Sequence, residues 1–454
     1  MKIINPHSGH FILEVAEDDE QSLFKKYTTL IKGQVDWQSV GLAHRKAIIS
    51  RYLQLLEETL EEGAQLLTQE VGKPLQQSRN EINGARARIS WMLDHVDKAL
   101  AEEVMTETSA ITELIRYEPL GVVANISAWN YPYLVGTNVI IPALLAGNAV
   151  LYKPSEFATL TGMHMDELLK RAGVPQNVFQ LAIGAGDVGN WLIDLPLNGY
   201  FFTGSYATGH AIFKRVAEKM VPCQCELGGK DPLYVADDVE DIKAVAVATA
   251  DGVFYNNGQS CCAVERIYVH ERVYDAYIKE FIEEVKSWKV GDPLEEDVYI
   301  GALTRPAQID LLNRQVTDAV SKGAIVMTGG KAIVGPGNHF EPTVIAGVTH
   351  EMELMKEESF GPIIGIMKVS DDEEAIRLMN DTPYGLTASV YSSSQLRAEK
   401  ILHKMKTGTG YWNCCDRVSA ALPWSGRGHS GFGSTLSHVG LRAFTQPKAY
   451  HLKK

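Results

Sequence analysis

Two adjacent cysteines, Cys261 and Cys262, lie in the segment NNGQSCCAVE at residues 256–265. A thiolate attacks carbonyl carbons well and leaves readily once it carries an acyl group, so a cysteine can support a covalent catalytic cycle. Such a cycle also needs hydrogen-bond donors for the oxyanion that develops and a base that helps to remove the acyl group. If either cysteine is catalytic, residues for these roles lie elsewhere in the chain.

Glycine-rich loops are further candidates, because their backbone can approach phosphate groups closely. The segment GAGDVG (184–189) fits the G-x-G-x-x-G pattern between an expected strand and an expected helix. The acidic residue that should follow about 20 positions later is missing, since FFTGSYATG occupies that region. A standard dinucleotide fingerprint is therefore not favoured, and plain turn glycines are the alternative.

A second loop, TGSYATG at 203–209, is a stronger phosphate candidate. Gly204 and Ser205 stand between the apolar strand YFF and an expected helix, whose first N–H groups can bind an anion. A capped helix start without a ligand is the alternative.

The segment LYKPSE (151–156) closes another expected strand with a cation and a carboxylate three residues apart. Lys153 and Glu156 are suited to hold two ribose hydroxyls, and Glu156 would repel an additional 2′-phosphate. A surface ion pair is the alternative for these two residues.

The apolar pattern predicts the elements that would position these residues. From about residue 120, β-rich apolar runs alternate with helical ones, which predicts a parallel sheet with crossover helices. A second alternating series begins near Lys230 and predicts a second α/β domain. Upstream, apolar residues recur at helical spacing from His44 to Val71, before Gly72-Lys73-Pro74, which predicts one long amphipathic surface helix.

Composition narrows the class of protein. With 454 residues, of which 45% are hydrophobic, the chain can bury cores for two or three domains. A net charge of −13 without a basic run argues against nucleic acid as a partner. The apolar stretch at 134–152 is punctuated by Asn138, Pro142 and Gly147, so we expect buried core and no membrane span. The first twenty residues lack an apolar signal core, which favours a cytoplasmic location.

Six cysteines fall into three close pairs, which is not the pattern of a disulfide framework in a chain of this size. None has the C-x2-C spacing of a zinc site, so no metal is expected. The pairs are Cys223 with Cys225, Cys261 with Cys262, and Cys414 with Cys415.

Five separated stretches together resemble the aldehyde dehydrogenase superfamily. They are ISAWNYP (126–132), LYKPSE (151–156), FTGS (202–205) with ELGGK (226–230), GQSCCA (258–263) and EESFGP (357–362). They appear in the family's order and cover nearly the whole chain, so the resemblance is specific to the superfamily but not to one member. It implies an α/β fold with a Rossmann-type cofactor domain, an α/β catalytic domain and a small β oligomerisation element.

By that resemblance, the NAD-binding domain comprises residues 1–100 and 120–229, and the catalytic domain comprises residues 230–430. The oligomerisation element comprises a hairpin at 101–119 and a tail at 431–454. A β tail that adds to a partner's sheet would explain a polar terminus with nothing to pack on, and it implies a homodimer or a homotetramer.

The resemblance also implies a reaction, the NAD-dependent oxidation of a small-molecule aldehyde to a carboxylic acid. Cys261, the cysteine of the G-Q-x-C pattern, would attack the aldehyde to give a thiohemiacetal. The side-chain amide of Asn130 and the backbone N–H of Cys261 would stabilise the oxyanion. After hydride transfer, Glu226 of ELGGK would activate the water that hydrolyses the thioester. A buried or capping carboxylate is the alternative role for Glu226.

A larger set of residues is implied to bind the cofactor, which is NAD, with NADP less favoured. Lys153 and Glu156 would hold the adenosine ribose, and Ser205 would lie near the pyrophosphate. Glu358 would hold the nicotinamide ribose beside Phe360, and GAGDVG would sit beside the adenine. The set is Ile126, Trp129, Lys153, Ser155, Glu156, Gly186, Phe202, Gly204, Ser205, Leu227, Glu358 and Phe360.

Residues on the substrate side are mostly aromatic or small and neutral, which favours an uncharged or cationic aldehyde over a dicarboxylic semialdehyde. They are Tyr131, Val135, Asn138, Tyr255, Ser260, Cys262 and Trp424. Arg417 is the exception, because it would bind a substrate carboxylate if it points inward, unless the adjacent Asp416 neutralises it.

Three other functions compete with this one. A CoA-acylating aldehyde dehydrogenase would pass the acyl group to CoA, but a base at Glu226 argues for water. A cofactor-free cysteine hydrolase needs a histidine within reach of the thiol, and no histidine segment here resembles such a partner. A catalytically silent binding protein is disfavoured because cysteine, asparagine and glutamate are all present.

Overall fold

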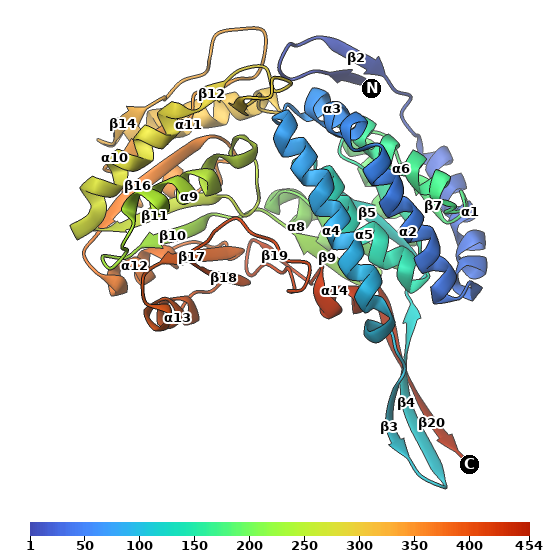
Figure 1. Ribbon diagram of the computed structural model, residues 1–454. Coiled ribbons are helices and arrows are strands. Elements are labelled where there is room, and N and C mark those ends of the chain that lie inside the picture. Colours follow the sequence, from blue (N-terminus) through green and yellow to red (C-terminus); the bar gives the residue numbers. More distant parts are fainter.

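Two open β-sheets and a small antiparallel sheet organise the chain, and the computed structural model describes residues 1–454 (Figure 1). The first sheet has the strand order β19-β9-β8-β5-β6-β7, and its strands are parallel except for β19. Its strands are β5 (Val122–Ile126), β6 (Ala149–Lys153), β7 (Phe179–Leu181), β8 (Gly199–Thr203), β9 (Cys223–Glu226) and β19 (Gly431–Phe432). The alternation predicted from residue 120 is therefore present.

Helices surround this first sheet. They are α1 (Glu20–Ser39), α2 (Leu42–Glu58), α3 (Leu60–Val71), α4 (Leu75–Ala99), α5 (Pro132–Ala146), α6 (Thr159–Ala172), α7 (Gly186–Asp194), α8 (Tyr206–Ala217) and α14 (Ser437–Arg442). Helix α5 is apolar all round and packs against α2, α4 and β6, as a helix buried on every side should. No helix combines the length and the apolar character that a membrane crossing requires.

The prediction of one surface helix from His44 to Val71 is wrong. The segment forms α2 and α3, which separate at Thr59, where the backbone leaves helical geometry (φ −111°, ψ 19°). The Thr59 hydroxyl and the Thr59 backbone N–H both donate to the carbonyl oxygen of Leu55, at 2.8 Å and 3.0 Å, in the last turn of α2. Both helices are also partly buried, because α2 packs on α4, α5 and α6.

The second sheet has the strand order β14-β15-β16-β11-β10-β17-β18 and is parallel except for the edge strand β14. Its strands are β10 (Asp231–Val235), β11 (Val264–His270), β14 (Ile325–Thr328), β15 (Thr343–Ala346), β16 (Ile363–Val369), β17 (Thr387–Tyr391) and β18 (Thr409–Trp412). The associated helices are α9 (Ile242–Phe254), α10 (Glu271–Ser287), α11 (Pro306–Ser321), α12 (Asp372–Met379) and α13 (Gln395–His403). The short elements are β1 (Lys2–Ile4), β2 (Phe11–Glu14), β12 (Lys289–Val290), β13 (Val298–Ile300) and the 3-10 turns η1 (Tyr255–Gly258) and η2 (Glu353–Met355).

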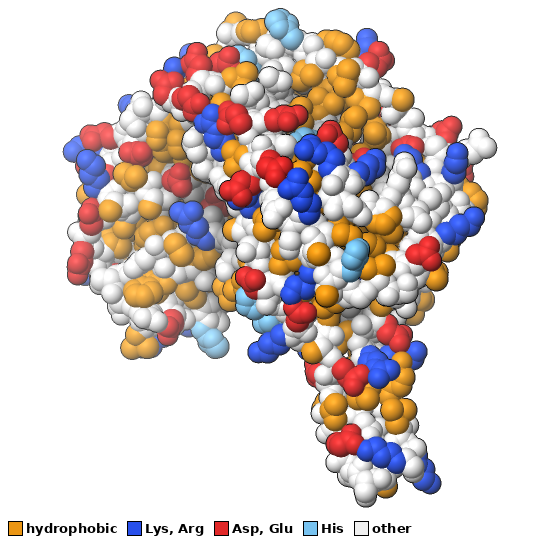
Figure 2. All heavy atoms as spheres, turned by 45° about the vertical axis from the view of Figure 1, so that its right-hand side comes forward, with side chains coloured by type: hydrophobic (Ala, Val, Ile, Leu, Met, Phe, Trp, Pro, Cys, Tyr) orange, Lys and Arg blue, Asp and Glu red, His pale blue; other side chains and the backbone are white.

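A three-stranded arm projects from the body of the molecule (Figures 1 and 2). It consists of β3 (Glu103–Glu107), β4 (Ile111–Pro119) and β20 (Thr445–Lys453), in the order β20-β4-β3. Its bounds are narrower than the predicted tail. Residues 431–444 stay with the first sheet, because β19 pairs with β9 and α14 packs on α4 and α5.

A tight buried turn precedes Cys261 and connects α9 to β11. Asn256 (φ 54°), Asn257 (φ 57°) and Gly258 (φ 71°) all have left-handed backbone conformations. Asparagine tolerates this region better than most residues, and glycine adopts it without strain. The side-chain amide of Asn256 donates to the carbonyl oxygen of Gln259 at 3.0 Å, so buried hydrogen bonds hold the turn in place.

Substitution of Gly258 tests how strictly this turn is built. A Cβ atom there would lie 2.3 Å from the carbonyl oxygen of Gly361, so Gly258→Ala must displace backbone as well as strain φ. Gly323→Ala is the matched control, because Gly323 is also left-handed (φ 93°) but has open space around it. We expect the control to cost roughly 1–2 kcal/mol from conformation alone and Gly258→Ala to cost more. Equal thermal unfolding midpoints for the two variants would contradict this account.

Candidate active site

A cavity of about 530 Å³ lies between helices α4 and α5 on one side and the segments 251–262 and 416–424 on the other. Cys261 and Glu226 both line it. The structure brings all seven predicted substrate-side residues to its wall: Tyr131, Val135, Asn138, Tyr255, Ser260, Cys262 and Trp424. The wall also contains charged residues from α4 and from the segment after β18, including Arg88, Asp416 and Arg417.

Cys261 is half-buried at the cavity wall, and its backbone N–H has no protein acceptor. The neighbouring Cys262 thiol lowers the pKa of the Cys261 thiol, but burial and the charges of Glu226, Asp231 and Asp416 outweigh it and raise that pKa to about 11. The thiol therefore stays protonated at neutral pH and needs a proton acceptor when it attacks.

Cys262 is buried more deeply and lies in a different environment. Its thiol donates to Asp416 Oδ1 at 3.0 Å, and the Ser260 hydroxyl donates to the same oxygen at 3.2 Å. The Cys261 thiol, burial and the charge of Asp416 all raise the pKa of Cys262 well above its usual value. Cys262 is therefore the poorer nucleophile of the two.

Asn130 is held on both sides. Its Nδ2 atom donates to the carbonyl oxygen of Gln259 at 3.1 Å, two residues before Cys261. Its own carbonyl oxygen accepts from Lys73 Nζ at 2.7 Å, and that ammonium forms a fully buried ion pair with Glu81. Glu81 Oε1 in turn accepts from the backbone N–H of Tyr133 at 2.9 Å. One buried pair thus fixes both ends of the turn that carries the Asn130 amide.

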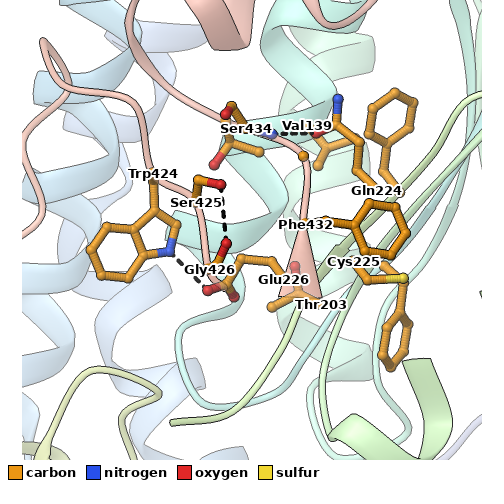
Figure 3. A pocket seen from close by; sticks show the side chains of 14 residues that line it. Val139, Thr203, Gln224, Cys225, Glu226, Trp424, Ser425, Gly426, Phe432 and Ser434 are labelled. Carbon is orange, nitrogen blue, oxygen red and sulfur yellow. Dashed lines mark hydrogen bonds between the residues drawn. The ribbon is translucent and has the colours of Figure 1, made fainter. Parts of the chain in front are cut away.

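Glu226 ends β9 and points to the indole of Trp424 (Figure 3). Trp424 Nε1 donates to Glu226 Oε1 at 2.8 Å. Burial raises the pKa of the Glu226 carboxyl to about 7, although the bond from Trp424 and the charge of Arg88 oppose the rise. A carboxylate whose pKa lies near neutrality is suited to general base catalysis.

The predicted adenosine-side residues lie at the carboxyl ends of neighbouring parallel strands, where open α/β sheets bind their ligands. Lys153 ends β6 and is 5% exposed, and its ammonium donates only to the carbonyl oxygen of Pro154 at 3.3 Å. It forms no ion pair with Glu156, although the two are three residues apart. The free donors of a buried lysine beside a carboxylate suit the two hydroxyls of a ribose.

Other predicted cofactor residues surround the same edge. Ile126 ends β5, Phe202 lies in β8, and Leu227 follows β9, all three buried. Ser155 Oγ donates to Glu156 Oε2 at 3.2 Å.

Two helices begin at this edge. Ser205 caps α8, and its hydroxyl accepts from the backbone N–H of Thr208, so the N-terminus after Gly204 is aligned to receive an anion. Gly186 begins α7, with nothing within 4 Å of the place where a Cβ would lie. The Lys153 side chain comes within 3.6 Å of the place where a Cβ on Gly189 would lie. The segment GAGDVG therefore lies beside Lys153, one of the two residues predicted to hold the ribose.

The predicted nicotinamide-side residues lie between the two sheets. Glu358 Oε1 accepts from the backbone N–H of Gly229 at 3.0 Å. Burial and the charge of Glu265 raise the pKa of Glu358 to about 8. Phe360 has a left-handed backbone (φ 48°) and meets the Trp129 ring edge to face, with ring centroids 5.5 Å apart.

Comparison with known proteins identifies the family. The chain matches the model described as "Aldehyde dehydrogenase family" over residues 1–450. It belongs to the aldehyde dehydrogenase family. The predicted family, the fold class and the enzymatic activity are confirmed: the chain is an aldehyde dehydrogenase, which oxidises an aldehyde with a nicotinamide dinucleotide.

Relatives extend this result. Aminoaldehyde dehydrogenase 1, peroxisomal, of Pisum sativum is 34% identical over 91% of this chain and 83% of its own length. The crystal structure of an indole-3-acetaldehyde dehydrogenase in complex with NAD+ superposes with a TM-score of 0.97 at 31% identity, over 100% of this chain and 93% of that one. An E. coli NADP-dependent enzyme superposes with a TM-score of 0.96 at 29% identity, over 100% and 94%.

Three buried charged residues of the site were missed by the sequence analysis: Lys73, Glu81 and Arg88. Lys73 was interpreted only as part of a helix stop. Glu81 and Arg88 are seven residues apart on α4, a spacing that places them on one face. The same side of α4 buries Ile82, Ala85 and Ile89 in the core. Two charged residues among these apolar positions were the signal from which a buried functional role could have been predicted.

Breaking the buried pair should destabilise the protein strongly. Lys73→Met leaves Glu81 without its counter-ion in a site where both side chains are fully buried, which should cost about 3–5 kcal/mol. Lys46→Met, which breaks the exposed pair with Asp97, should cost less than about 1 kcal/mol. Thermal unfolding measures both.

The pH dependence of this loss of stability shows whether it comes from the uncompensated charge or from lost packing. Burial raises the pKa of Glu81, so at acidic pH the carboxyl of Lys73→Met becomes neutral and its desolvation penalty disappears. The deficit of the variant relative to the parent should therefore shrink as pH falls. A deficit that is independent of pH would indicate lost packing instead.

If Glu226 is the base of deacylation, Trp424→Phe should move the pH profile of the steady-state rate. The indole N–H stabilises the ionised form of Glu226, so its removal raises the pKa above about 7 and shifts the rise of the steady-state rate to higher pH. A shift of roughly one unit corresponds to one charged hydrogen bond. Trp412→Phe is the control, because Trp412 lies outside the cavity and donates to Ser392. The same midpoint in both variants would contradict the assignment.

Proposed function

We propose that this aldehyde dehydrogenase uses Cys261 as its nucleophile, Asn130 as an oxyanion donor and Glu226 as the base that delivers water, with NAD as its cofactor. The observation that carries the proposal is the single cavity that Cys261 and Glu226 share with all seven predicted substrate-side residues. Cys261 would attack the aldehyde, Asn130 would stabilise the oxyanion, and Glu226 would help water to release the acid.

The covalent step begins with the Cys261 thiol. Its sulfur attacks the aldehyde carbon, its proton passes to a carboxylate of the cavity, and the carbonyl oxygen becomes an oxyanion. The free backbone N–H of Cys261 donates to that oxygen. The Asn130 amide, which donates to Gln259 in this structure, turns to the oxyanion as a second donor.

Oxidation and release follow. When bound, NAD would supply the acceptor for the hydride that leaves the thiohemiacetal carbon, and the product held on Cys261 would be a thioester. Glu226 then removes a proton from water, which attacks the thioester carbon and frees the carboxylic acid and the thiol. Because its pKa lies at about 7, Glu226 can release to solvent a proton taken up from the thiol and be ionised again before it accepts a proton from water.

The residues present fit a dinucleotide that lacks a 2′-phosphate. Lys153 has free donors, and Glu156 stands where such a phosphate would be repelled. These two residues support NAD over NADP. Relatives of both kinds exist, so the preference is measured directly by comparing the two cofactors in one assay.

Two alternatives have less support. A cysteine hydrolase needs a histidine near its thiol, and no histidine lines the cavity. CoA acylation needs no water-activating base, whereas Glu226 is present with a pKa near neutrality.

We also propose that the chain is a homodimer or a homotetramer and acts in the cytoplasm. Strands β20 and β3 are the two edges of the projecting arm, and a sheet edge offers its free backbone groups to another strand. The six free thiols support a reducing compartment.

Two cysteine variants test the nucleophile. Cys261→Ala should abolish NADH formation from a panel of aldehydes, because no sulfur remains to carry the acyl group. Cys262→Ala serves as the control for packing, since it changes the adjacent, more deeply buried thiol. The reverse pattern would overturn the assignment.

Glu226→Gln tests the base in the same assay. The amide cannot take a proton from water, so one equivalent of NADH should form in a burst before turnover falls by roughly 100-fold or more. Addition of CoA separates the acylating alternative, because only that reaction requires CoA for wild-type turnover.

A further inference from the structure

Arg88 is a buried cation that the reaction above does not use. Its side chain is 8% exposed and lines the catalytic cavity from α4. Its only hydrogen bond runs from Nη1 to Asn138 Oδ1 at 2.9 Å. No carboxylate lies within ion-pair distance of it, and its other donor nitrogens remain accessible to the cavity. A buried guanidinium with free donors is costly unless an anion completes it.

The acidic groups of the same wall already have partners. Glu81 is paired with Lys73, Asp251 accepts from Tyr299, and Glu226 accepts from Trp424. Asp416 holds the donors of Ser260 and Cys262. None of them forms an ion pair or a hydrogen bond with Arg88, whose only such partner is Asn138.

Arg417 adds a second positive charge to this wall. It lines the cavity with an exposed side chain that makes no hydrogen bond, and it forms no ion pair with the adjacent Asp416. Arg88 and Arg417 are thus the two arginines whose donors remain available to a ligand in the cavity.

We propose that Arg88 binds an anionic group of the substrate, so that the enzyme prefers aldehydes that carry a carboxylate. This proposal rests on the proposed function and refines it. It reverses the sequence-based expectation of an uncharged or cationic aldehyde, which rested on the seven neutral positions and left the role of Arg417 open. A planar guanidinium forms two parallel hydrogen bonds with a carboxylate, and the bond from Nη1 to Asn138 Oδ1 leaves Nε and Nη2 of Arg88 for them.

Substrate selectivity tests the proposal. The kcat/KM of the wild type is measured with NAD for succinic semialdehyde, for its neutral counterpart butanal and for the cationic aminobutanal. We expect the carboxylated aldehyde to exceed butanal by about 10-fold or more, the value of one hydrogen-bonded charge. Glutarate, which lacks an aldehyde, should inhibit in competition with the aldehyde.

Arg88→Met should lower the ratio of kcat/KM for succinic semialdehyde to that for butanal by roughly 10–100-fold. Arg88 also lowers the pKa of Glu226, but this effect acts on both substrates and cancels in the ratio. Arg88→Lys should restore part of the ratio, because it keeps the charge without the planar fork. Arg86→Met is the matched control, two positions away on α4, where Arg86 pairs with Glu57.

The outcomes separate this proposal from the proposed function. A wild type that oxidises butanal or aminobutanal as well as the carboxylated aldehyde, or a ratio that Arg88→Met leaves unchanged, overturns the role of Arg88 alone. No NADH from any aldehyde overturns the proposed function. If Arg88→Met does not fold, wild-type selectivity and glutarate inhibition still decide the question.

Discussion

The buried ion pair of Lys73 and Glu81 is the interaction on which the geometry of the active site depends. Both charges are fully removed from water, and each is compensated by the other and by a hydrogen bond to the backbone. Lys73 holds the carbonyl oxygen of Asn130 and Glu81 holds the N–H of Tyr133, which fixes the turn between β5 and α5. The Asn130 amide then reaches Gln259, at the entrance to β11 of the second sheet. One pair therefore sets the position of Asn130, the proposed oxyanion donor, relative to Cys261, the proposed nucleophile.

The same burial determines the protonation of the reacting groups. It raises the pKa of Glu226 to about 7 and that of Asp416 to about 6, and together with nearby carboxylates it raises that of the Cys261 thiol to about 11. The Cys261 thiol is therefore protonated in the resting enzyme, and its attack requires removal of that proton. Glu226 has a pKa near neutrality because burial outweighs the hydrogen bond from Trp424 and the charge of Arg88, so it can take up and release a proton near neutral pH.

Local sequence was sufficient for the parts of the site that short motifs encode. Gly-Gln before Cys261, the LGGK after Glu226 and the apolar strands that precede Lys153 and Ser205 are all contiguous signals, and the structure places each at a strand end or a tight turn. Contacts between distant segments were not readable in this way. Lys73 meets Asn130 across 57 positions, and the break at Thr59 interrupts a run of apolar residues whose helical spacing does not reveal it.

The chemistry of the reaction and the choice of substrate are carried by different residues of one element. Glu81 lies near the start of α4, where it fixes the turn that carries Asn130, the proposed oxyanion donor. Arg88 follows seven residues later on the same face, about 10 Å further along the axis. The motifs that reveal the family lie outside α4, so they specify the reaction but leave the charge at position 88 free to differ. A change at Arg88 therefore alters what the far end of the substrate meets while the ion pair, the oxyanion donor and the nucleophile keep their places.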